Sequence, residues 1–409
     1  MDRRAFVWSS SLVALQLLGV AGCSTARRPA GGAAPRTTAP RLPFYDAPGP
    51  IVPIRADIDR IFRITVCLRP FRAAGPRQDV ERVGEKIVVH NYGHGGSGWS
   101  LSWGSADVVV RRALEGSPGL EECGVVGCGA LGLTAALTAQ RMGLRVTIYA
   151  KERPPYVRSA RATGSWTPDS RVALGSAVAS DFGATWERMA RTSFAMYQSY
   201  LGAAGTPVEW TDRYALDDDR DGGLQESGGA VHDFVYMNDR IHDLTPRWQE
   251  MPPGSTPFPT RHVHRSSTLT FNVASYARQL VEEFQIGGGR IETREFHAPS
   301  ELAALPQSTI IDCTGYGARS LWHDESIVPI RGQIAWLIPQ EDVHYGIFYK
   351  DLNVLARRDG IVIQPMPQGD ETGWNDANEE PDRAEAEAGV RTLQKLYARI
   401  EQPTKGQKT

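Results

Sequence analysis

Hydrophobic and polar positions are spaced in two ways along the chain, and they predict both strands and helices. Apolar and β-branched runs at 61–66, 86–90, 309–313, 328–338 and 361–363 predict strands. Apolar residues at helical spacing predict helices over 106–114, 184–201, 275–284 and 383–400. Residues 116–119, with a glycine at each end, predict the end of the first helix. Such a mixture is typical of an α/β fold.

The pattern is clearest over 124–150. A buried strand over 124–126 leads into the turn Gly-Cys-Gly-Ala-Leu-Gly, then a helix over 133–142 and a second strand over 145–150. Gly127 allows the tight turn, Gly129 lets backbone approach a pyrophosphate, and Gly132 lets the helix lie close to the strand. Ala130 and Leu131 stand in this turn directly before the helix, whose N-terminal amides attract phosphate. This unit predicts a dinucleotide site.

An acidic residue in the expected place supports this reading. Glu152 follows the second strand, about 20 residues after the last glycine, where a carboxylate can accept hydrogen bonds from a ribose. Lys151 stands one place earlier, and the sequence leaves open which of the two meets the nucleotide. Thr314 and Gly315, after a buried strand, are candidates for a second contact, or for a plain turn. The motif alone does not distinguish FAD from NAD.

Two further segments are candidates for chemistry. The string His-Asn-Tyr-Gly-His-Gly-Gly-Ser-Gly-Trp-Ser over 90–100 contains enough glycine to lay its backbone against a flat ring. The alternatives are a flexible loop, or a metal site at His90 and His94 that no other metal-ligand spacing supports. Arg69, held before Pro70 at a strand end, can bind a carboxylate with both arms of its guanidinium group, although a surface ion pair is the ordinary use.

Composition sets outer limits on these readings. The chain has 409 residues, which suits two packed domains. Its net charge of −2 provides no electrostatic footprint for nucleic acid. The four cysteines beyond residue 23 match no zinc or redox spacing and are expected to be reduced.

The first residues predict a targeting signal for export. Arg3 and Arg4 precede an apolar run over 6–22 that ends at Cys23, a pattern similar to a bacterial twin-arginine lipoprotein signal over 1–23. A membrane anchor or an uncleaved start is the alternative. Residues 24–43, rich in Ala, Pro, Gly, Arg and Thr, are expected to form a disordered tether. We therefore expect an exported protein, in the periplasm or on the cell surface, held to the membrane only by a lipid on Cys23.

These segments together resemble the D-amino acid oxidase family. The resemblance lies in residues 124–150, 157–166, 264–276, 310–315 and 328–333, together with the Arg69-Pro70 pair and the string over 90–96. The resemblance implies an α/β fold of two domains, a Rossmann-like FAD-binding domain and a substrate domain with a mixed sheet. It also implies non-covalent FAD, an amino-acid substrate and dioxygen as the electron acceptor.

The order of these segments differs from the family's. The Arg69-Pro70 and 90–96 segments come last in the family but precede the glycine turn here, which indicates a circular permutation. Residues 44–122 are then the displaced segment and 123–409 the rest of the fold. The FAD domain is expected over about 86–166 and 262–325, and the substrate domain over about 167–261, 326–409 and 51–80.

The resemblance also implies site residues. Arg69 would pair with the substrate carboxylate, and the Gly95 carbonyl would face the substrate amine. Flavin contacts are implied for Gly96, Gly98, Trp99, Ser100, Arg158, Ser159, Thr163, Gly164 and Ser165. The implied reaction is oxidative deamination of a D-amino acid to a 2-oxo acid, with ammonia and hydrogen peroxide.

One departure concerns a tyrosine that the family places over the substrate. The corresponding position falls at Leu352 or Asn353, and Tyr349 is the candidate replacement. Two other functions therefore stay open. One is a dehydrogenase or oxidase of another amine or a secondary amino acid, and the other is an inactive, surface-tethered flavin-binding lipoprotein.

Overall fold

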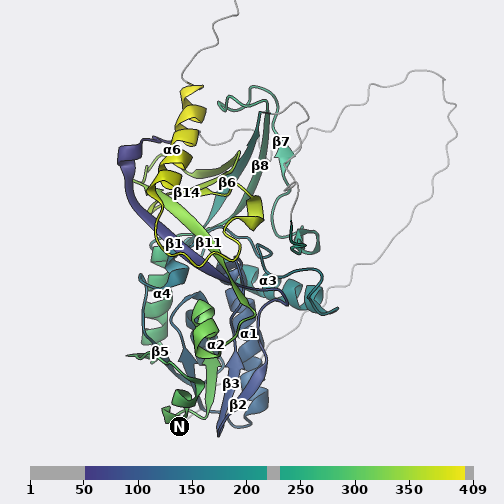
Figure 1. The fold of residues 1–409 in the computed structure, drawn as a ribbon, viewed down its shortest axis with the longest axis vertical. Helices are drawn as coiled ribbons and strands as arrows, with labels where there is room; N and C mark the ends of the chain where they lie inside the picture. The colour runs from purple at the N-terminus through teal and green to yellow at the C-terminus, as the bar shows by residue number, and fades with distance from the viewer. Residues whose placement is uncertain (1–50, 219–230, 401–409) are drawn as a thin grey trace, which may run out of the picture. The chain divides into compact units, whose positions relative to one another are not determined.

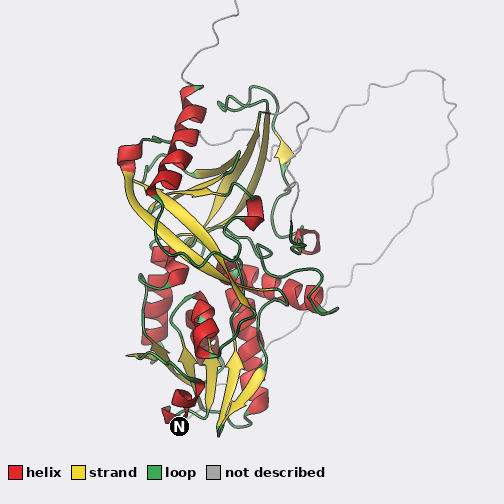
Figure 2. Cartoon of the chain, in the orientation of Figure 1, coloured by secondary structure: helices red, strands yellow, loops and turns green. Residues whose placement is uncertain are grey.

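The computed structural model describes residues 51–218 and 231–400 (Figures 1 and 2). The predicted signal over 1–23, with Cys23, and the predicted tether over 24–43 lie outside the described residues. The described residues form two sheets that belong to one compact unit. Within the described residues, no helix is long and apolar enough to span a membrane.

The first sheet has six strands and carries the predicted nucleotide-binding unit. Its order is β2 (Val80–Val83), β3 (Lys86–His90), β10 (Thr309–Asp312), β4 (Glu122–Val126), β5 (Arg145–Ala150) and β9 (Arg290–Thr293). All neighbours pair in parallel except β2, which pairs antiparallel with β3. A mainly parallel sheet of this kind confirms the Rossmann-like prediction.

Both faces of this sheet are buried, which explains why its strands read as continuous apolar runs. Val89, Val125 and Ile311 point into the core with α1 (Gly98–Gly116), α2 (Ala130–Arg141), α3 (Phe182–Gln198) and α4 (Val273–Ile286). Their neighbours Val88, Val126 and Ile310 point to the opposite face, against Leu302 and Leu305. The alternation follows the two-residue period of a strand.

Helix α1 is longer than the sequence predicts. It begins at Gly98, inside the glycine-rich string, and ends at Gly116 as expected. Glycine and serine disfavour helix, so the sequence indicates a loop here. Burial overrides that preference, because Trp99, Trp103 and Ala106 are buried in the helical core. The helix therefore starts where the predicted flavin-contacting residues lie.

The second sheet has eight strands and is mixed. Its order is β1 (Ile61–Arg72), β11 (Ile327–Leu337), β14 (Gly360–Pro365), β13 (Leu352–Arg357), β12 (Tyr345–Tyr349), β6 (Val208–Asp217), β8 (His262–Phe271) and β7 (Gln249–Glu250). Only the β12–β6 pair is parallel. Strand β8 falls in a segment predicted for the FAD domain. It pairs within this second sheet, while its Leu269 and Phe271 pack in the core cluster of α1–α4.

Helix α6 (Arg383–Ala398) covers one face of the second sheet (Figure 1). Its Val390 and Leu393 pack with Ile347, Val354 and Ile363 in one apolar cluster. Residues that alternate with these, such as Phe348, Asn353 and Gln364, point to the other face, which borders a cavity. The period of the strands thus divides the sheet into a structural face and a face available for binding.

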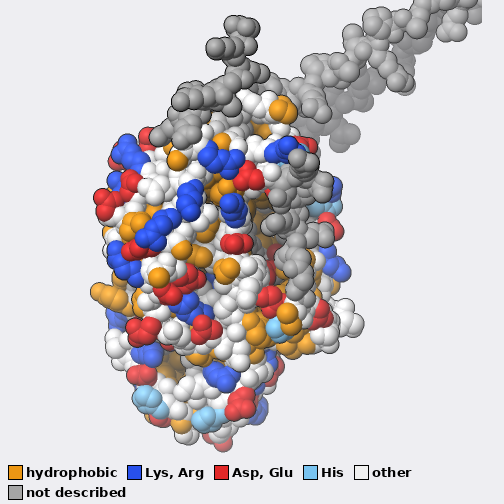
Figure 3. Space-filling model, turned by 45° about the horizontal axis from the view of Figure 1, so that its top comes forward, with side chains coloured by type: hydrophobic (Ala, Val, Ile, Leu, Met, Phe, Trp, Pro, Cys, Tyr) orange, Lys and Arg blue, Asp and Glu red, His pale blue; other side chains and the backbone are white. Residues whose placement is uncertain are grey.

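The surface carries no large area of one charge on the face that Figure 3 displays, where basic and acidic side chains both occur. Large exposed apolar side chains such as Tyr156, Val231 and Ile286 come from well-separated parts of the chain. They therefore do not form one apolar patch.

Candidate functional site

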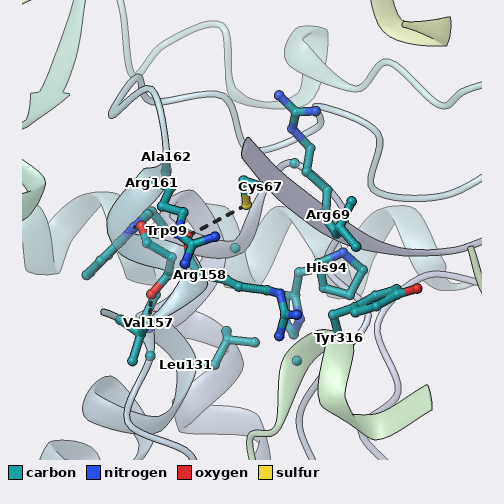
Figure 4. A pocket seen from close by; sticks show the side chains of 18 of the residues that line it. Cys67, Arg69, His94, Trp99, Leu131, Val157, Arg158, Arg161, Ala162 and Tyr316 are labelled. Atoms are coloured by element: carbon teal, nitrogen blue, oxygen red, sulfur yellow. Dashed lines mark hydrogen bonds between the residues drawn. The ribbon is translucent and has the colours of Figure 1, made fainter. Parts of the chain in front are cut away.

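A cavity of about 590 Å³ lies at the carboxyl ends of the parallel strands β4, β5 and β10 and extends to the inner face of the second sheet. Ligands of open α/β sheets bind at this edge. The cavity collects residues from both halves of the chain, including Arg69, Gly98, Leu131, Glu152 and Thr314. Figure 4 shows Arg69 and His94 on one side and Trp99 and Arg161 on the other.

The glycine turn between β4 and α2 has the close contacts that its motif predicts. A Cβ at Gly127 would stand 2.4 Å from the Cys313 carbonyl oxygen, and one at Gly132 would stand 2.0 Å from the Gly127 carbonyl oxygen. Gly127 also has a φ of 109°, which glycine adopts readily. These positions are therefore restricted to glycine by backbone that lies against backbone. The N-terminus of α2 consequently opens onto the cavity, where Gly129, Ala130 and Leu131 line the wall.

Two predicted nucleotide contacts are placed beside this turn. The Ser159 hydroxyl accepts a hydrogen bond of 3.0 Å from the Ala130 amide at the start of α2. Lys151 forms an ion pair of 3.2 Å with Glu295, whereas Glu152 lines the cavity with no ion pair in the described part of the chain. The structure therefore favours Glu152 as the acceptor for a ribose.

The N-terminus of α1 supplies a second set of free amides. The first amides of a helix have no partner within it, and here they belong to Gly98, Trp99 and Ser100, which line the cavity. The Trp99 indole donates to the Ser159 carbonyl at 2.8 Å, and the Ser100 hydroxyl accepts from the Thr167 amide at 2.8 Å. These two bonds fix the helix end against the segment over 159–167.

Gly95 and Gly96 precede α1 in a tightly constrained turn. The Gly95 amide donates to the Pro70 carbonyl at 2.8 Å, next to Arg69. Its φ is 54°, and a Cβ there would overlap the Arg171 carbonyl oxygen at 1.8 Å. At Gly96 a Cβ would stand 2.6 Å from the Ser170 hydroxyl. The turn thus brings Gly95 close to Arg69.

The segment over 162–165 and the turn after β10 complete the predicted set. Thr163 donates to the Gln364 amide oxygen at 2.7 Å, and Gly164 has a φ of 92° with its carbonyl accepting from the Phe271 amide. Thr314 donates to Asp312 through its hydroxyl at 2.7 Å. Gly315 has a φ of 59° and open space where a Cβ would stand. All of these line the cavity, together with Arg158 and Ser165.

Arg69 lies on β1 with its guanidinium group across the neighbouring strand β11. A Cβ at Gly332 would stand 2.3 Å from Arg69 Nη2, so only glycine leaves room for it. Arg69 donates to the Ile330 carbonyl at 3.4 Å and has no salt bridge within the described residues. Burial, followed by the nearby Arg171, lowers the Arg69 pKa to about 10, so the group is charged at neutral pH. A half-buried cation without an anion is suited to a carboxylate ligand.

His94 lines the cavity as a neutral side chain. Its Nε2 is 2.8 Å from the Ser105 hydroxyl, whose own proton goes to the Asn91 amide oxygen at 2.6 Å. The hydroxyl therefore accepts from His94 Nε2–H, and Nδ1 is left as a buried acceptor with no partner in the described chain. Burial lowers the His94 pKa to about 3, so the imidazole is neutral at pH 7 and contributes a polar but uncharged surface to the cavity.

The prediction for Tyr349 is wrong. Tyr349 points to the face covered by α6, where its hydroxyl donates to Asp218 at 2.9 Å, and it does not line the cavity. Its neighbour Phe348 lines the cavity instead, together with Asn353, which pairs with Phe348 on the adjacent strand β13. Adjacent residues of a strand point to opposite faces of the sheet. A shift of one residue along β12 therefore moves a side chain from the cavity into the core beneath α6.

Several lining residues were not predicted from the sequence. Arg171 lines the cavity and forms an ion pair of 3.0 Å with Asp370, which also accepts from the Tyr236 hydroxyl at 2.9 Å. Gln364 lines it from β14. These residues belong to separate loops and strands without a local motif. For Gln364, the two-residue alternation of β14 is a signal in the sequence, and Arg171 has none.

The two histidines considered as metal ligands have other partners. His90 is buried between Asp312 and Glu81, each at 3.0 Å, and His94 bonds to Ser105. Over residues 51–218 and 231–400, no group of three or more His, Cys, Asp or Glu side chains could hold a metal ion.

The comparisons with known proteins decide the family. The profile of the DAO family, described as FAD-dependent oxidoreductases, matches residues 122–406. The chain belongs to this family. It is therefore an FAD-dependent oxidoreductase.

Individual relatives are distant. A D-amino-acid oxidase of Rubrobacter xylanophilus is 27% identical over 312 residues, which cover 71% of this chain and 79% of that protein. A D-amino-acid oxidase of Streptomyces coelicolor is 26% identical over 291 residues, covering 68% and 78%. Among solved structures, an L-proline dehydrogenase from P. horikoshii matches with a TM-score of 0.45 at 14% identity, covering 69% of this chain and 78% of that one.

The cavity of this DAO-family chain fits FAD by its own geometry. The two helix N-termini can hold a pyrophosphate and a polar ring edge, and Glu152 can hold a ribose. At Gly98 no atom lies within 4 Å of the place where a Cβ would stand. A ring laid against the backbone of this glycine meets no side chain.

We predict that Gly98→Leu blocks this space. The added side chain should lower FAD affinity by roughly tenfold or more, equivalent to at least about 1.4 kcal/mol. FAD content after purification and a titration of apoprotein by flavin fluorescence measure the effect. Gly116→Leu, at the opposite end of the same helix and outside the cavity, is the matched control. Equal FAD affinity in both variants would show that the flavin does not pass Gly98.

Proposed function

We propose that this chain oxidises D-amino acids to 2-oxo acids, with release of ammonia and hydrogen peroxide. The observation that carries the proposal is Arg69, a cation without an anionic partner in the described chain, set beside Gly95 in the FAD-binding cavity. The choice of D-amino acids rests on the names of the Rubrobacter and Streptomyces relatives.

The chain's own residues would place the substrate for this reaction. Arg69 binds the α-carboxylate with both arms, and the Gly95 carbonyl accepts from the amine. These two anchors orient the α-carbon with its hydrogen toward the site where Gly98–Ser100 begin α1. The neutral His94 adds no charge to oppose the amine.

The proposed reaction balances with bound FAD, water and dioxygen. The amino acid loses its α-hydrogen and one amine hydrogen, with two electrons, and becomes an imino acid. Bound FAD supplies the acceptor for those two electrons. Water then hydrolyses the imino acid to the 2-oxo acid and ammonia, and dioxygen takes up two electrons and two protons as hydrogen peroxide.

A second candidate is the oxidation of another amine or a secondary amino acid, with electrons passed to a carrier. The observation that favours it is Asn353, which lines the cavity where the family resemblance leads one to expect a tyrosine. A shorter side chain leaves more room near the substrate. Peroxide yield in air separates the candidates, because a dehydrogenase would reduce an artificial acceptor but form little peroxide.

We predict that Arg69→Ala raises the KM for the best D-amino acid by about 100-fold, because a bidentate charged contact is lost. FAD content should be unchanged. Gly332→Ala should act in the same direction by displacing the guanidinium group. Steady-state peroxide assays measure the effect, and the exposed Arg63→Ala on the same strand is the control. An unchanged KM in Arg69→Ala would remove Arg69 from the substrate site.

We also propose that the chain is a circular permutation of the family fold. The family profile begins at residue 122, yet β1, β3 and α1, from the preceding segment, are integral to both sheets and the cavity. The two ends of the described chain also meet. The Tyr345 hydroxyl bonds to the Val52 carbonyl and to the Tyr397 hydroxyl, and Ile51 and Ile400 pack against the same cluster.

We predict that a reordered chain folds. Residues 122–400 followed by a short flexible linker and residues 51–116 should bind FAD and keep the activity of the natural order, because both ends already pack together. Bound flavin and thermal melting measure this. Insoluble or flavin-free protein, with the same linker tolerated at the 117–121 junction of the natural order, would argue against the permutation.

Export is the third element of the proposal, and it rests on the sequence of residues 1–23. In a bacterial host with a twin-arginine system, Arg3→Lys with Arg4→Lys should keep the protein in the cytoplasm. Cys23→Ser should release it from the membrane fraction. Cell fractionation measures both, and an unaltered distribution of either variant would contradict the corresponding step.

A further inference from the structure

A second arginine stands behind the cavity wall. Arg213 lies on β6, is 2% exposed, and forms no salt bridge within the described residues. A Cβ at Gly346 on β12 would stand 2.7 Å from its Nε, so this guanidinium group also lies across a glycine. Its Nε has no partner in the described chain. A buried cation of this kind is costly unless something in its surroundings repays the desolvation.

The guanidinium group of Arg213 contacts three side chains, and all three line the cavity. Nη1 donates to the Ser165 hydroxyl at 3.0 Å, and Nη2 donates to the Asn353 amide oxygen at 2.6 Å. The guanidinium carbon stands 4.4 Å from the centre of the Phe348 ring. Ser165, Phe348 and Asn353 line the cavity, whereas Arg213 lies one layer behind them. The charge is therefore one side chain away from a bound ligand.

An arginine can only donate, and this fixes how its partners face. Because the Asn353 oxygen is held by Arg213, the amide nitrogen with its two hydrogens is left for another partner. Because the Ser165 oxygen accepts from Arg213, its own hydroxyl proton is also free to donate. Neither group donates to any residue of the described chain. Both are thus available to a ligand as donors.

Gln364 adds a third donor to those of Ser165 and Asn353, and these three side chains are called the donor wall below. Its amide oxygen accepts from the Thr163 hydroxyl at 2.7 Å, which leaves the amide nitrogen for the cavity that Gln364 lines. Gln364 stands opposite Asn353 in the β13–β14 ladder, so the two side chains share one face. Three side chains therefore present hydrogen-bond donors, with one uncompensated cation behind them.

Two of the carboxylates that line the cavity, those of Asp370 and Asp169, are already engaged. Asp370 is paired with Arg171 at 3.0 Å and accepts from Tyr236. Asp169 accepts from the Met237 amide at 3.0 Å, and burial raises the pKa of its carboxyl group. Neither is bonded to Arg213, Ser165 or Asn353. The donor wall is therefore open to an anion brought by a ligand.

We propose that Arg213, acting through Ser165 and Asn353, selects amino acids whose side chain ends in a carboxylate. The inference rests on the proposed function, because it takes Arg69 as the site of the α-carboxylate. The two arginines then define two separate anionic ends of one substrate, a dicarboxylic amino acid. Arg213 is a positioning and specificity residue, since it touches the groups that contact the substrate.

The charge required for this role is present under ordinary conditions. Burial lowers the Arg213 pKa to about 9, so the guanidinium group is protonated at neutral pH. In the interior, a charge acts over a distance of one side chain with less screening than in water. A ligand carboxylate would gain hydrogen bonds from Asn353 and Ser165 and attraction from Arg213, whereas the equivalent amide would gain far less.

The substrate test compares matched acids and amides. Wild-type enzyme should have a kcat/KM for D-glutamate or D-aspartate at least roughly tenfold above that for D-glutamine or D-asparagine, the scale of one charge-assisted contact. Arg213→Met keeps the length and removes the charge, and should abolish this ratio by weakening the acids alone. Arg213→Lys should preserve part of the ratio. A wild-type ratio near one, or a ratio unchanged in a folded Arg213→Met, would overturn the proposal.

A binding test needs no turnover and no variant. Succinate and glutarate, compared with succinamate and butyrate, are titrated into the FAD-loaded protein while the flavin absorbance is followed. Tighter binding of the dicarboxylates supports the Arg213 role, and equal binding of all four refutes it while leaving Arg69 as a carboxylate site. Binding of none would refute the proposed function as well, so the two failures are distinguishable.

The flavin itself is the competing occupant of this wall, since its ring also carries acceptors. If Arg213→Met lowers FAD affinity or shifts the flavin spectrum of ligand-free protein, and leaves the acid-to-amide ratio unchanged, the donors serve the cofactor and the proposal fails. Arg357→Met is the control for the acid-to-amide ratio, because Arg357 is also buried in this sheet but is paired with Asp359 at 2.6 Å. It is not a control for FAD affinity, because Arg357 also donates to the Ala162 and Thr163 carbonyls beside the cavity.

Discussion

A guanidinium group can lie flat across a β-sheet only where the neighbouring strand has no side chain in its way. The second sheet meets this condition twice, at Gly332 beneath Arg69 and at Gly346 beneath Arg213. Both arginines reach the cavity side because each crosses a strand that it could not otherwise pass. The arrangement depends on the pairing of β1 with β11 and of β6 with β12, since a one-residue slip would put another side chain under each arginine.

The same sheet explains why the two faces behave differently. The face beneath α6 is closed by aliphatic residues and buried tyrosines, which stabilise the fold without chemistry. The cavity face carries amides, a hydroxyl and two cations without anions in the described chain. Polar groups of this kind reduce stability when they are unpaired, so their concentration on one face points to a ligand that completes them.

The sequence predicts those parts of the site that depend on local geometry. The turn at Gly127–Gly132 follows from a local motif, and Gly95 belongs to a string that the family resemblance marks. The structure shows why both need glycine, although the backbone that lies against Gly127 and Gly95 belongs to the distant residues Cys313 and Arg171. Arg69 could be named because a family motif marks it. Tyr349 was misassigned because the choice between adjacent strand residues depends on register, which only the partner strand determines. Arg213 carries no local signal, since its contacts come from residues about 50 and 140 positions away.

The early start of α1 at Gly98 has a thermodynamic consequence. This helix lies between β3 and β4 along the chain, and its first amides lack helical partners. A ligand that satisfies them binds the folded chain and not the unfolded one, so it shifts the folding equilibrium by mass action. Cofactor occupancy and folding are then one coupled equilibrium. FAD that is present while the chain folds would therefore add to the stability of the native state.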